Sequence, residues 1–69
     1  MASQIFIRLP EVRRLTGFSR SEIYRLIGLQ RFPAQIPLGE RAVAWIESEV
    51  VAWIESRINA SRPEKRVAG

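Results

Sequence analysis

Hydrophobic residues recur at helical spacing in three stretches of the chain, and an interval containing two prolines separates the second stretch from the third. In the first stretch, Leu9, Val12 and Leu15 are spaced as on one face of a helix. Pro10 suits the first turn, where a helix needs no amide donor. Gly17 ends the segment, because glycine adopts the left-handed C-cap conformation at little cost. The pattern predicts a short helix between Pro10 and Gly17.

A second helix is predicted to begin directly after Ser19. The run Ser19-Arg20-Ser21-Glu22 matches a capping box, in which Ser19 accepts from the Glu22 amide and the Glu22 side chain bonds back. Phe18 before the cap and Ile23 after it have the spacing of a hydrophobic staple. Two short helices joined by this corner form a helix-turn-helix.

The second helix is predicted to be amphipathic. Its buried stripe consists of Ile23, Leu26 and Ile27. Since each residue turns a helix by about 100°, the opposite side carries Ser21, Arg25 and Gly28, flanked by Arg20 and Tyr24.

The interval after this helix reads as a β-hairpin. Pro33 and Pro37 exclude a helix there. Strands are expected over 35–38 and 41–45, joined by a type II′ turn at Gly39-Glu40. This register places Arg41 at the tip, and it places four apolar residues on one face: Ile36, Leu38, Val43 and Trp45. The hairpin is expected to be the wing of the helix-turn-helix.

A third helix is predicted to begin near Ser48, a good N-cap residue. Its core stripe is Val50, Trp53, Ile54 and Ile58. Arg57 falls inside this stripe, where it either extends its charged end past the stripe's edge into water or contacts a second copy of the chain.

A hexamer occurs twice, at 43–48 and 51–56, as Val-Ala-Trp-Ile-Glu-Ser. The first copy is predicted to be mostly strand and the second helix, because tertiary contacts override local propensity.

The predicted fold is therefore mainly α: a small winged helix-turn-helix of three helices, with a two-stranded hairpin wing between the second and third. We expect residues 1–60 to form this single domain and residues 61–69 to form a flexible basic tail.

Composition excludes several classes of function. The chain has 69 residues and lacks Cys, His and Asp, so a disulfide framework, a Cys/His zinc site, a Cys nucleophile and a Ser-His-Asp triad are all excluded. The glutamates and Lys65 offer no general base with a partner, so we expect no enzymatic activity, no metal and no cofactor. No apolar run approaches the roughly 20 residues of a membrane span, and the first residues do not resemble a secretory signal. We therefore expect a cytoplasmic protein that makes no membrane contact.

Positive charge is concentrated in the first half of the chain. Residues 8–31 contain six arginines against two glutamates, whereas residues 40–57 contain two against four. Nearly all of the positive charge is carried by guanidinium groups, which suit phosphates and guanine edges. The alternative is ordinary solvated surface charge. The coincidence with a helix-turn-helix favours double-stranded DNA as the partner.

The exposed side of the second helix is the candidate reader of base edges in the major groove. The residues expected to contact DNA from this helix and its cap are Ser19, Arg20, Ser21, Tyr24 and Arg25. Arg41 at the wing tip would hold a phosphate or enter the minor groove. Further candidates for backbone contacts are Arg8, Arg13, Arg14 and Arg31. Tyr24 could instead be a packing residue, and Arg14 and Arg31 could simply be solvated.

Taken together, these segments resemble the AlpA family of prophage regulators. The resemblance rests on Arg8-Leu-Pro-Glu-Val12, Thr16-Gly-Phe-Ser-Arg20, Ile23-Tyr-Arg-Leu-Ile27, Phe32-Pro33 and Trp45-Ile-Glu-Ser-Glu-Val50 with Trp53. It covers residues 8 to about 58 and implies membership of the wider MerR-like and excisionase-like winged-helix group. By position, it makes 20–28 the recognition helix and assigns Arg41 to the wing.

The resemblance implies a sequence-specific regulator of phage or integrative-element genes. Two alternatives stay open: an excisionase that bends DNA at an attachment site, and a protein-interaction module with no DNA role. A single short recognition helix has a small footprint, so useful affinity requires cooperative binding by several monomers or a partner such as RNA polymerase or integrase. One departure concerns Gln30, where such sequences often have Gly; Gln30 is therefore expected to adopt a left-handed conformation.

Overall fold

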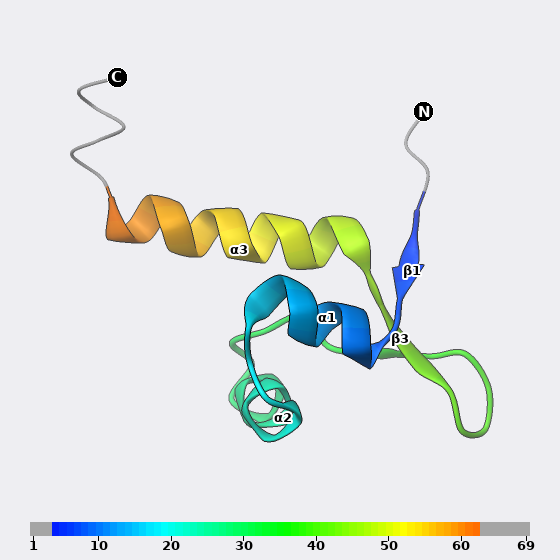
Figure 1. Cartoon of the computed structure of the whole chain (residues 1–69). Helices are drawn as coiled ribbons and strands as arrows, with labels where there is room; N and C mark the ends of the chain where they lie inside the picture. The colour runs from blue at the N-terminus through cyan, green and yellow to red at the C-terminus, as the bar shows by residue number, and fades with distance from the viewer. Residues whose placement is uncertain (1–3, 63–69) are drawn as a thin grey trace.

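The computed structural model describes residues 4–62, which form three helices and three short strands (Figure 1). In chain order the elements are β1 (Phe6–Ile7), α1 (Leu9–Thr16), α2 (Arg20–Gly28), β2 (Ile36–Pro37), β3 (Val43–Ile46) and α3 (Glu47–Ser61). The predicted fold class is confirmed, with a hairpin between the second and third helices. The predicted basic tail over 61–69 lies outside the described residues except for Ser61, the last residue of α3, and Arg62.

A strand that the sequence pattern did not predict completes the sheet. The strand order is β1-β3-β2, and both pairings are antiparallel. Phe6 pairs with Ile46 and Ile7 with Trp45. The Glu47 amide then donates to the Ile5 carbonyl at 2.8 Å. This bond ties the first turn of α3 to the chain just before β1.

The hairpin exists, but its predicted register is wrong by one residue. Ile36 pairs with Ala44, and the Leu38 amide donates to the Ala42 carbonyl at 2.7 Å, so the connecting loop has three residues, 39–41. Gly39 does not have the positive φ that a type II′ turn needs. Ala44 and Trp45 are adjacent on β3, so their side chains lie on opposite faces, and both are fully buried. An alternating pattern therefore could not define the register.

The core is built around Trp45, the largest fully buried side chain. Each helix contributes one completely buried residue to it: Val12 from α1, Ile23 from α2 and Val50 from α3. The Trp45 indole Nε1 donates to the Pro33 carbonyl at 3.0 Å, which satisfies the polar atom of the ring. The helices thus pack on one central residue of the sheet.

The third helix differs from its prediction at both ends. It begins at Glu47 with Ile46 as N-cap, so Ser48 is not the cap. The chain passes directly from β3 into the helix. The Glu47 amide, the first of α3, donates to the Ile5 carbonyl, so it has a backbone partner. Ile58 is 46% exposed and lies outside the core, whereas Trp53 and Ile54 are half-buried as expected.

The repeated hexamer adopts two conformations, as predicted. The first copy supplies all of β3 and the first residues of α3, and the second copy is entirely within α3.

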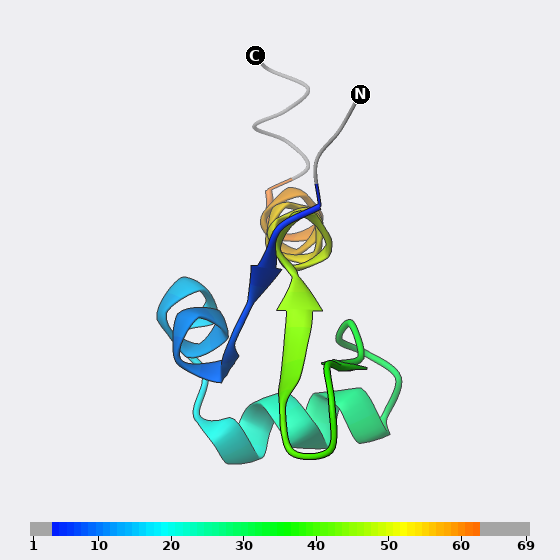
Figure 2. The same cartoon turned by 90° about the vertical axis from the view of Figure 1, so that its right-hand side faces the viewer.

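The views in Figure 1 and Figure 2 agree on the arrangement of the elements. The β2–β3 loop descends to the same end of the molecule as α2, and α3 lies at the opposite end. In Figure 1, α2 is seen nearly end-on, with the β2–β3 loop on one side and the C-terminal half of α3 on the other. Within 4–62, no helix is both long enough and apolar enough to cross a membrane.

Candidate nucleic-acid interface

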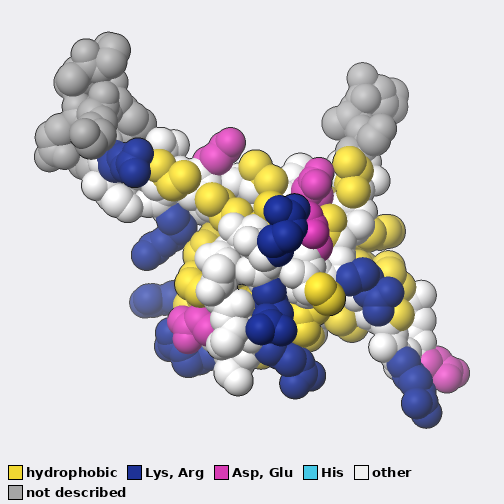
Figure 3. Space-filling model, viewed as in Figure 1, with side chains coloured by type: hydrophobic (Ala, Val, Ile, Leu, Met, Phe, Trp, Pro, Cys, Tyr) yellow, Lys and Arg dark blue, Asp and Glu magenta, His cyan; other side chains and the backbone are white. Residues whose placement is uncertain are grey.

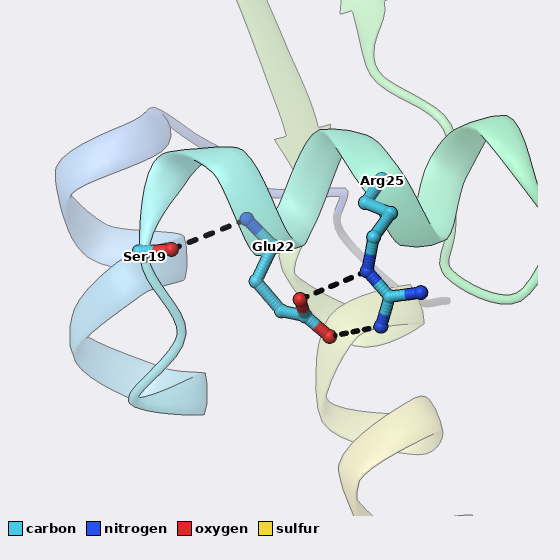
Figure 4. A network of polar contacts seen from close by, with 3 residues as sticks. All are labelled: Ser19, Glu22 and Arg25. Atoms are coloured by element: carbon cyan, nitrogen blue, oxygen red, sulfur yellow. Dashed lines mark hydrogen bonds and ion pairs between the residues drawn. The ribbon is translucent and has the colours of Figure 1, made fainter.

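The corner before α2 fixes how this helix leaves α1. Gly17 adopts φ 78°, and its amide donates to the Arg13 carbonyl at 2.8 Å, which closes α1. Ser19 caps α2, and its Oγ accepts from the Glu22 amide at 3.2 Å (Figure 4). The first half of the predicted capping box is therefore present. The Glu22 carboxylate does not complete it, since it is bonded to Arg25 instead.

The two faces of α2 are divided as the sequence predicted. Ile23 is completely buried, and Leu26 and Ile27 are half-buried against the core. Ser21, Arg25 and Gly28 are exposed on the other side. The side of α2 that faces away from the core is thus polar and positively charged.

Arg25 is held by a two-point contact with Glu22. Its Nε donates to Oε1 at 3.0 Å, and its Nη2 donates to Oε2 at 2.6 Å. This engages one edge of the guanidinium and leaves Nη1, together with the second hydrogen of Nη2, free to donate. The hydrogen bond from Arg25 holds the pKa of Glu22 below its usual value and raises that of Arg25. Arg25 therefore keeps its charge while its orientation is restricted.

Tyr24 and Arg20 form a second ordered pair on α2. The Tyr24 ring is half-buried and meets the Trp45 ring edge-on, with ring centroids 6.3 Å apart. The Arg20 guanidinium carbon lies 5.4 Å from the centroid of the Tyr24 ring. Tyr24 therefore packs on the core and positions an exposed arginine, and its contact with DNA stays a prediction.

Gln30 closes the end of α2 in the left-handed conformation. This was expected, because similar sequences often have glycine at this position. Gln30 has φ 60° and, among the described residues other than glycine, is the one with positive φ. Its amide donates to the Ile27 carbonyl at 2.9 Å, and the Arg31 amide donates to the Leu26 carbonyl at 2.8 Å. These are the two bonds of a Schellman motif. They fix the direction in which Arg31 leaves the helix.

The remaining predicted contacts come from α1, its N-cap and the wing. Arg8 precedes α1, and both it and Arg13 are exposed. Arg14 is exposed but paired with Glu11 through Nε and Nη2, in the same i,i+3 arrangement as Arg25 and Glu22. This hydrogen bond lowers the pKa of Glu11. Arg41 is exposed in the loop between β2 and β3, which makes it part of the wing tip.

A shallow pocket of about 320 Å³ lies between α2 and α3. Its lining consists of Phe18, Glu22, Arg25, Leu26, Arg31, Trp53 and Arg57. Sequence reasoning did not group these residues. The signal available in the sequence was Arg57, a charged residue within the apolar stripe of α3. Its guanidinium carbon lies 5.8 Å from the centroid of the Trp53 ring.

Positive side chains gather on the surface formed by α2, the wing and the C-terminal half of α3 (Figure 3). Figure 3 shows arginine side chains over α2, at the end of the wing, and beneath the C-terminal half of α3. Within 4–62 there is no cluster of three or more residues of the metal-binding types His, Cys, Asp and Glu. The arrangement suits contact with an extended anion.

Comparisons with known proteins identify the family of this chain. Residues 5–58 match the family model of the prophage CP4-57 regulatory protein (AlpA). An uncharacterized protein, ORF88, from Enterobacteria phage P4 is 55% identical over 53 residues, a stretch that covers 77% of this chain. The match spans 60% of the length of that relative. No solved structure matches. Because the family model takes in every strand, α1, α2 and most of α3, the chain belongs to the AlpA family of phage regulatory proteins.

Proposed function

We propose that this chain is a sequence-specific DNA-binding regulator of phage or integrative-element genes. The observation that carries the proposal is the division of α2, with a buried Ile23 on one side and exposed Arg20, Ser21 and Arg25 on the other. A helix with this kind of face fits the major groove and presents its first turns to base edges. The family's description as a prophage regulator supports the same conclusion.

In this proposal the side chains have different tasks. Arg25 donates through its free guanidinium edge to the O6 and N7 atoms of a guanine, while Glu22 restrains the other edge. Arg20 and Ser21 contact neighbouring base edges or phosphates. The Ser19 hydroxyl is occupied by the cap and would be a secondary contact.

Backbone contacts would position the helix without reading sequence. Arg41 meets a phosphate or the minor groove from the wing. Arg8, Arg13 and Arg14 face phosphates from α1 and its N-cap, and Arg14 can do so with the guanidinium edge that Glu11 leaves free.

The small footprint supports a further part of the proposal. One nine-residue recognition helix and one short wing reach few base pairs. We therefore propose that monomers bind repeated sites cooperatively or act with a protein partner such as RNA polymerase or integrase.

Selection of bound fragments from a phage-carrying host genome, followed by titration of the recovered sites at increasing salt, tests the proposal. Recovered fragments should share a sequence motif next to prophage promoters. The logarithm of the association constant should fall with the logarithm of salt concentration by about 0.9 per phosphate contact. Fragments confined to attachment sites would instead identify an excisionase. Absence of any salt-dependent DNA binding would leave a protein-interaction module.

A further inference from the structure

The pocket between α2 and α3 carries more positive charge than its acid can balance. Arg25, Arg31 and Arg57 come from three different segments of the chain, and Glu22 is the one carboxylate among the lining residues. Glu22 is already bonded to Arg25. Among the described residues, Arg31 and Arg57 form no ion pair. The pocket is therefore suited to an anion.

Arg31 starts from a fixed backbone position. Its amide donates to the Leu26 carbonyl at 2.8 Å, and its own carbonyl accepts from the Trp53 indole Nε1 at 2.7 Å. Both backbone polar groups are thus engaged by residues that line the pocket. Less backbone entropy is lost on binding when the arginine is anchored in this way.

Arg57 is also oriented, although no acid neutralises it in the described part of the chain. Its guanidinium lies over the Trp53 ring, 5.8 Å from the centroid. Trp53 is in turn held edge-on by Phe18 at 5.8 Å and by Phe32 at 4.9 Å between ring centroids. A cation–π contact positions a guanidinium without using its hydrogen-bond donors. Arg57 therefore remains able to bind an anion in a bidentate way.

The wing and the part of α3 that lines the pocket lie on different sides of α2 (Figure 1). In Figure 1 the β2–β3 loop is on one side of α2, and the C-terminal half of α3, which carries Arg57, is on the other. The major groove is bordered by two phosphate strands about 12 Å apart, and a helix inside it has one strand on each flank. If α2 occupies the groove, one strand faces the wing and the other faces the pocket.

We propose that the pocket between α2 and α3 binds a backbone phosphate of the DNA strand opposite the one met by the wing. Arg57 and Arg31 are the donors, and Trp53 positions both of them. The inference rests on the proposed placement of α2 in the major groove, and it adds α3 to the DNA-binding surface. A phosphate is favoured over an acidic protein segment because Arg25, the residue proposed to contact a guanine, lines the same pocket, so one polymer can occupy both places.

The test is a salt titration with a duplex of mixed sequence, roughly two helical turns long, because phosphate contacts do not depend on sequence. Arg57→Gln and Arg31→Gln should each reduce the slope of log K against log salt by about 0.9. Arg57→Lys should retain the slope, since it keeps the charge. Arg62→Gln is the matched control: it removes one charge at the end of α3 from a residue outside the pocket lining, and its slope should equal that of the wild type.

The possible outcomes separate this inference from the proposed function. Wild-type protein without salt-dependent binding to the duplex would remove the proposed function itself. Normal binding with unchanged slopes for Arg57→Gln and Arg31→Gln would overturn the pocket alone, as expected if it accepts an acidic protein segment. An equal loss for Arg62→Gln would also overturn it, because only overall charge would then matter. Far-ultraviolet circular dichroism confirms that each variant is folded, and Arg31→Gln decides the question if Arg57→Gln is not folded.

Discussion

The Glu22 carboxylate holds Arg25 by two hydrogen bonds, at 3.0 and 2.6 Å, along a single edge of the guanidinium. Both residues are partly exposed, with 36% and 59% of the side-chain surface accessible. Such a pair contributes little to stability in water. The pair instead orients Arg25, because it leaves one defined edge of the guanidinium free for a ligand. A negative group would be unfavourable on a helix that faces DNA, so we propose that Glu22 acts in recognition by orienting Arg25.

Arg25→Ala is expected to weaken binding to the cognate site by about 1–3 kcal/mol and to relax preference at one base pair. The reason is the loss of a bidentate contact with a guanine. Mobility-shift titrations against single-base variants of the selected site measure both effects. Arg41→Ala serves as the control, since loss of a phosphate contact should weaken all sequences alike and reduce the salt slope by about 1. Unchanged affinity and preference for Arg25→Ala would contradict the assignment of α2.

Glu22→Gln should raise affinity for non-cognate DNA and lower the ratio of cognate to non-cognate affinity. Removing the carboxylate adds one unit of net positive charge and also releases Arg25. Glu11→Gln provides the matched control, because Glu11 restrains Arg14 with the same spacing and the same guanidinium atoms on α1. We expect Glu11→Gln to raise non-cognate affinity to a similar extent and to preserve the ratio. Equal ratios for the two variants would show that Glu22 has no role in recognition.

DNA binding should be nearly independent of pH between about 6 and 8, because no histidine is present and no other side chain ordinarily titrates in this range. The Arg25 contact lowers the pKa of Glu22 from 4.5. The pair is therefore complete above the ordinary glutamate range and is lost only as pH falls through the lowered value. Anisotropy titrations at constant ionic strength measure this. A tenfold change in affinity between these limits would contradict it.

Trp45 and Trp53 should differ in their importance for stability. Trp45 is fully buried at the centre of the sheet, whereas Trp53 is half-buried at the edge of the core. Trp45→Ala is expected to cost about 3–5 kcal/mol, which is comparable with the whole stability of so small a domain. Trp53→Ala should cost less. Urea unfolding followed by circular dichroism compares the two, with Trp→Phe at each site as a milder substitution. A larger cost at Trp53 would contradict the packing described.

Gln30→Gly is expected to stabilise the fold. Gln30 has φ 60°, a conformation that costs a residue with a Cβ about 1–2 kcal/mol. Part of this gain is offset by the greater freedom of glycine in the unfolded chain, so a net increase of about 0.5–1 kcal/mol is expected. Thermal and urea unfolding measure the difference. Gly28→Ala, at a helical position with open space around its Cα, is the converse control and should also stabilise. A destabilised Gln30→Gly would show that the glutamine side chain makes a contact of its own.

The sequence predicted those elements whose boundaries depend on local chemistry. Ser19 and Gly17 marked the ends of their helices because a cap and a left-handed residue act on the adjacent backbone. The left-handed conformation of Gln30 was instead expected from the resemblance to the AlpA family, in which glycine often occupies this position before Phe32-Pro33.

The errors occurred where distant parts of the chain decide the structure. The two-residue strand β1 has no pattern of its own, and it is visible only through its pairing with β3. Both faces of β3 are buried, so the hairpin register depends on the packing of Trp45 rather than on alternation. The start of α3 is likewise fixed by a distant segment, since the Glu47 amide donates to the Ile5 carbonyl.

In the candidate site, the sequence predicted the composition of the exposed face of α2 but not the pairing within it. Glu22 could bond to the Ser19 amide or to Arg25, and spacing along a helix allows both. The grouping of Arg31 with Arg57 was also out of reach, since it depends on how α3 crosses α2.

The duplicated hexamer provides an internal standard for hydrogen exchange. The intrinsic exchange rate of an amide is set mainly by its neighbouring side chains, and these are identical at the interior positions of the two copies. Any difference in protection between Ala44-Trp45 and Ala52-Trp53 therefore measures the folded environment of each copy, its secondary structure together with its burial, without a peptide reference. The two copies compare a buried strand with a largely exposed helix while the local chemistry is held constant.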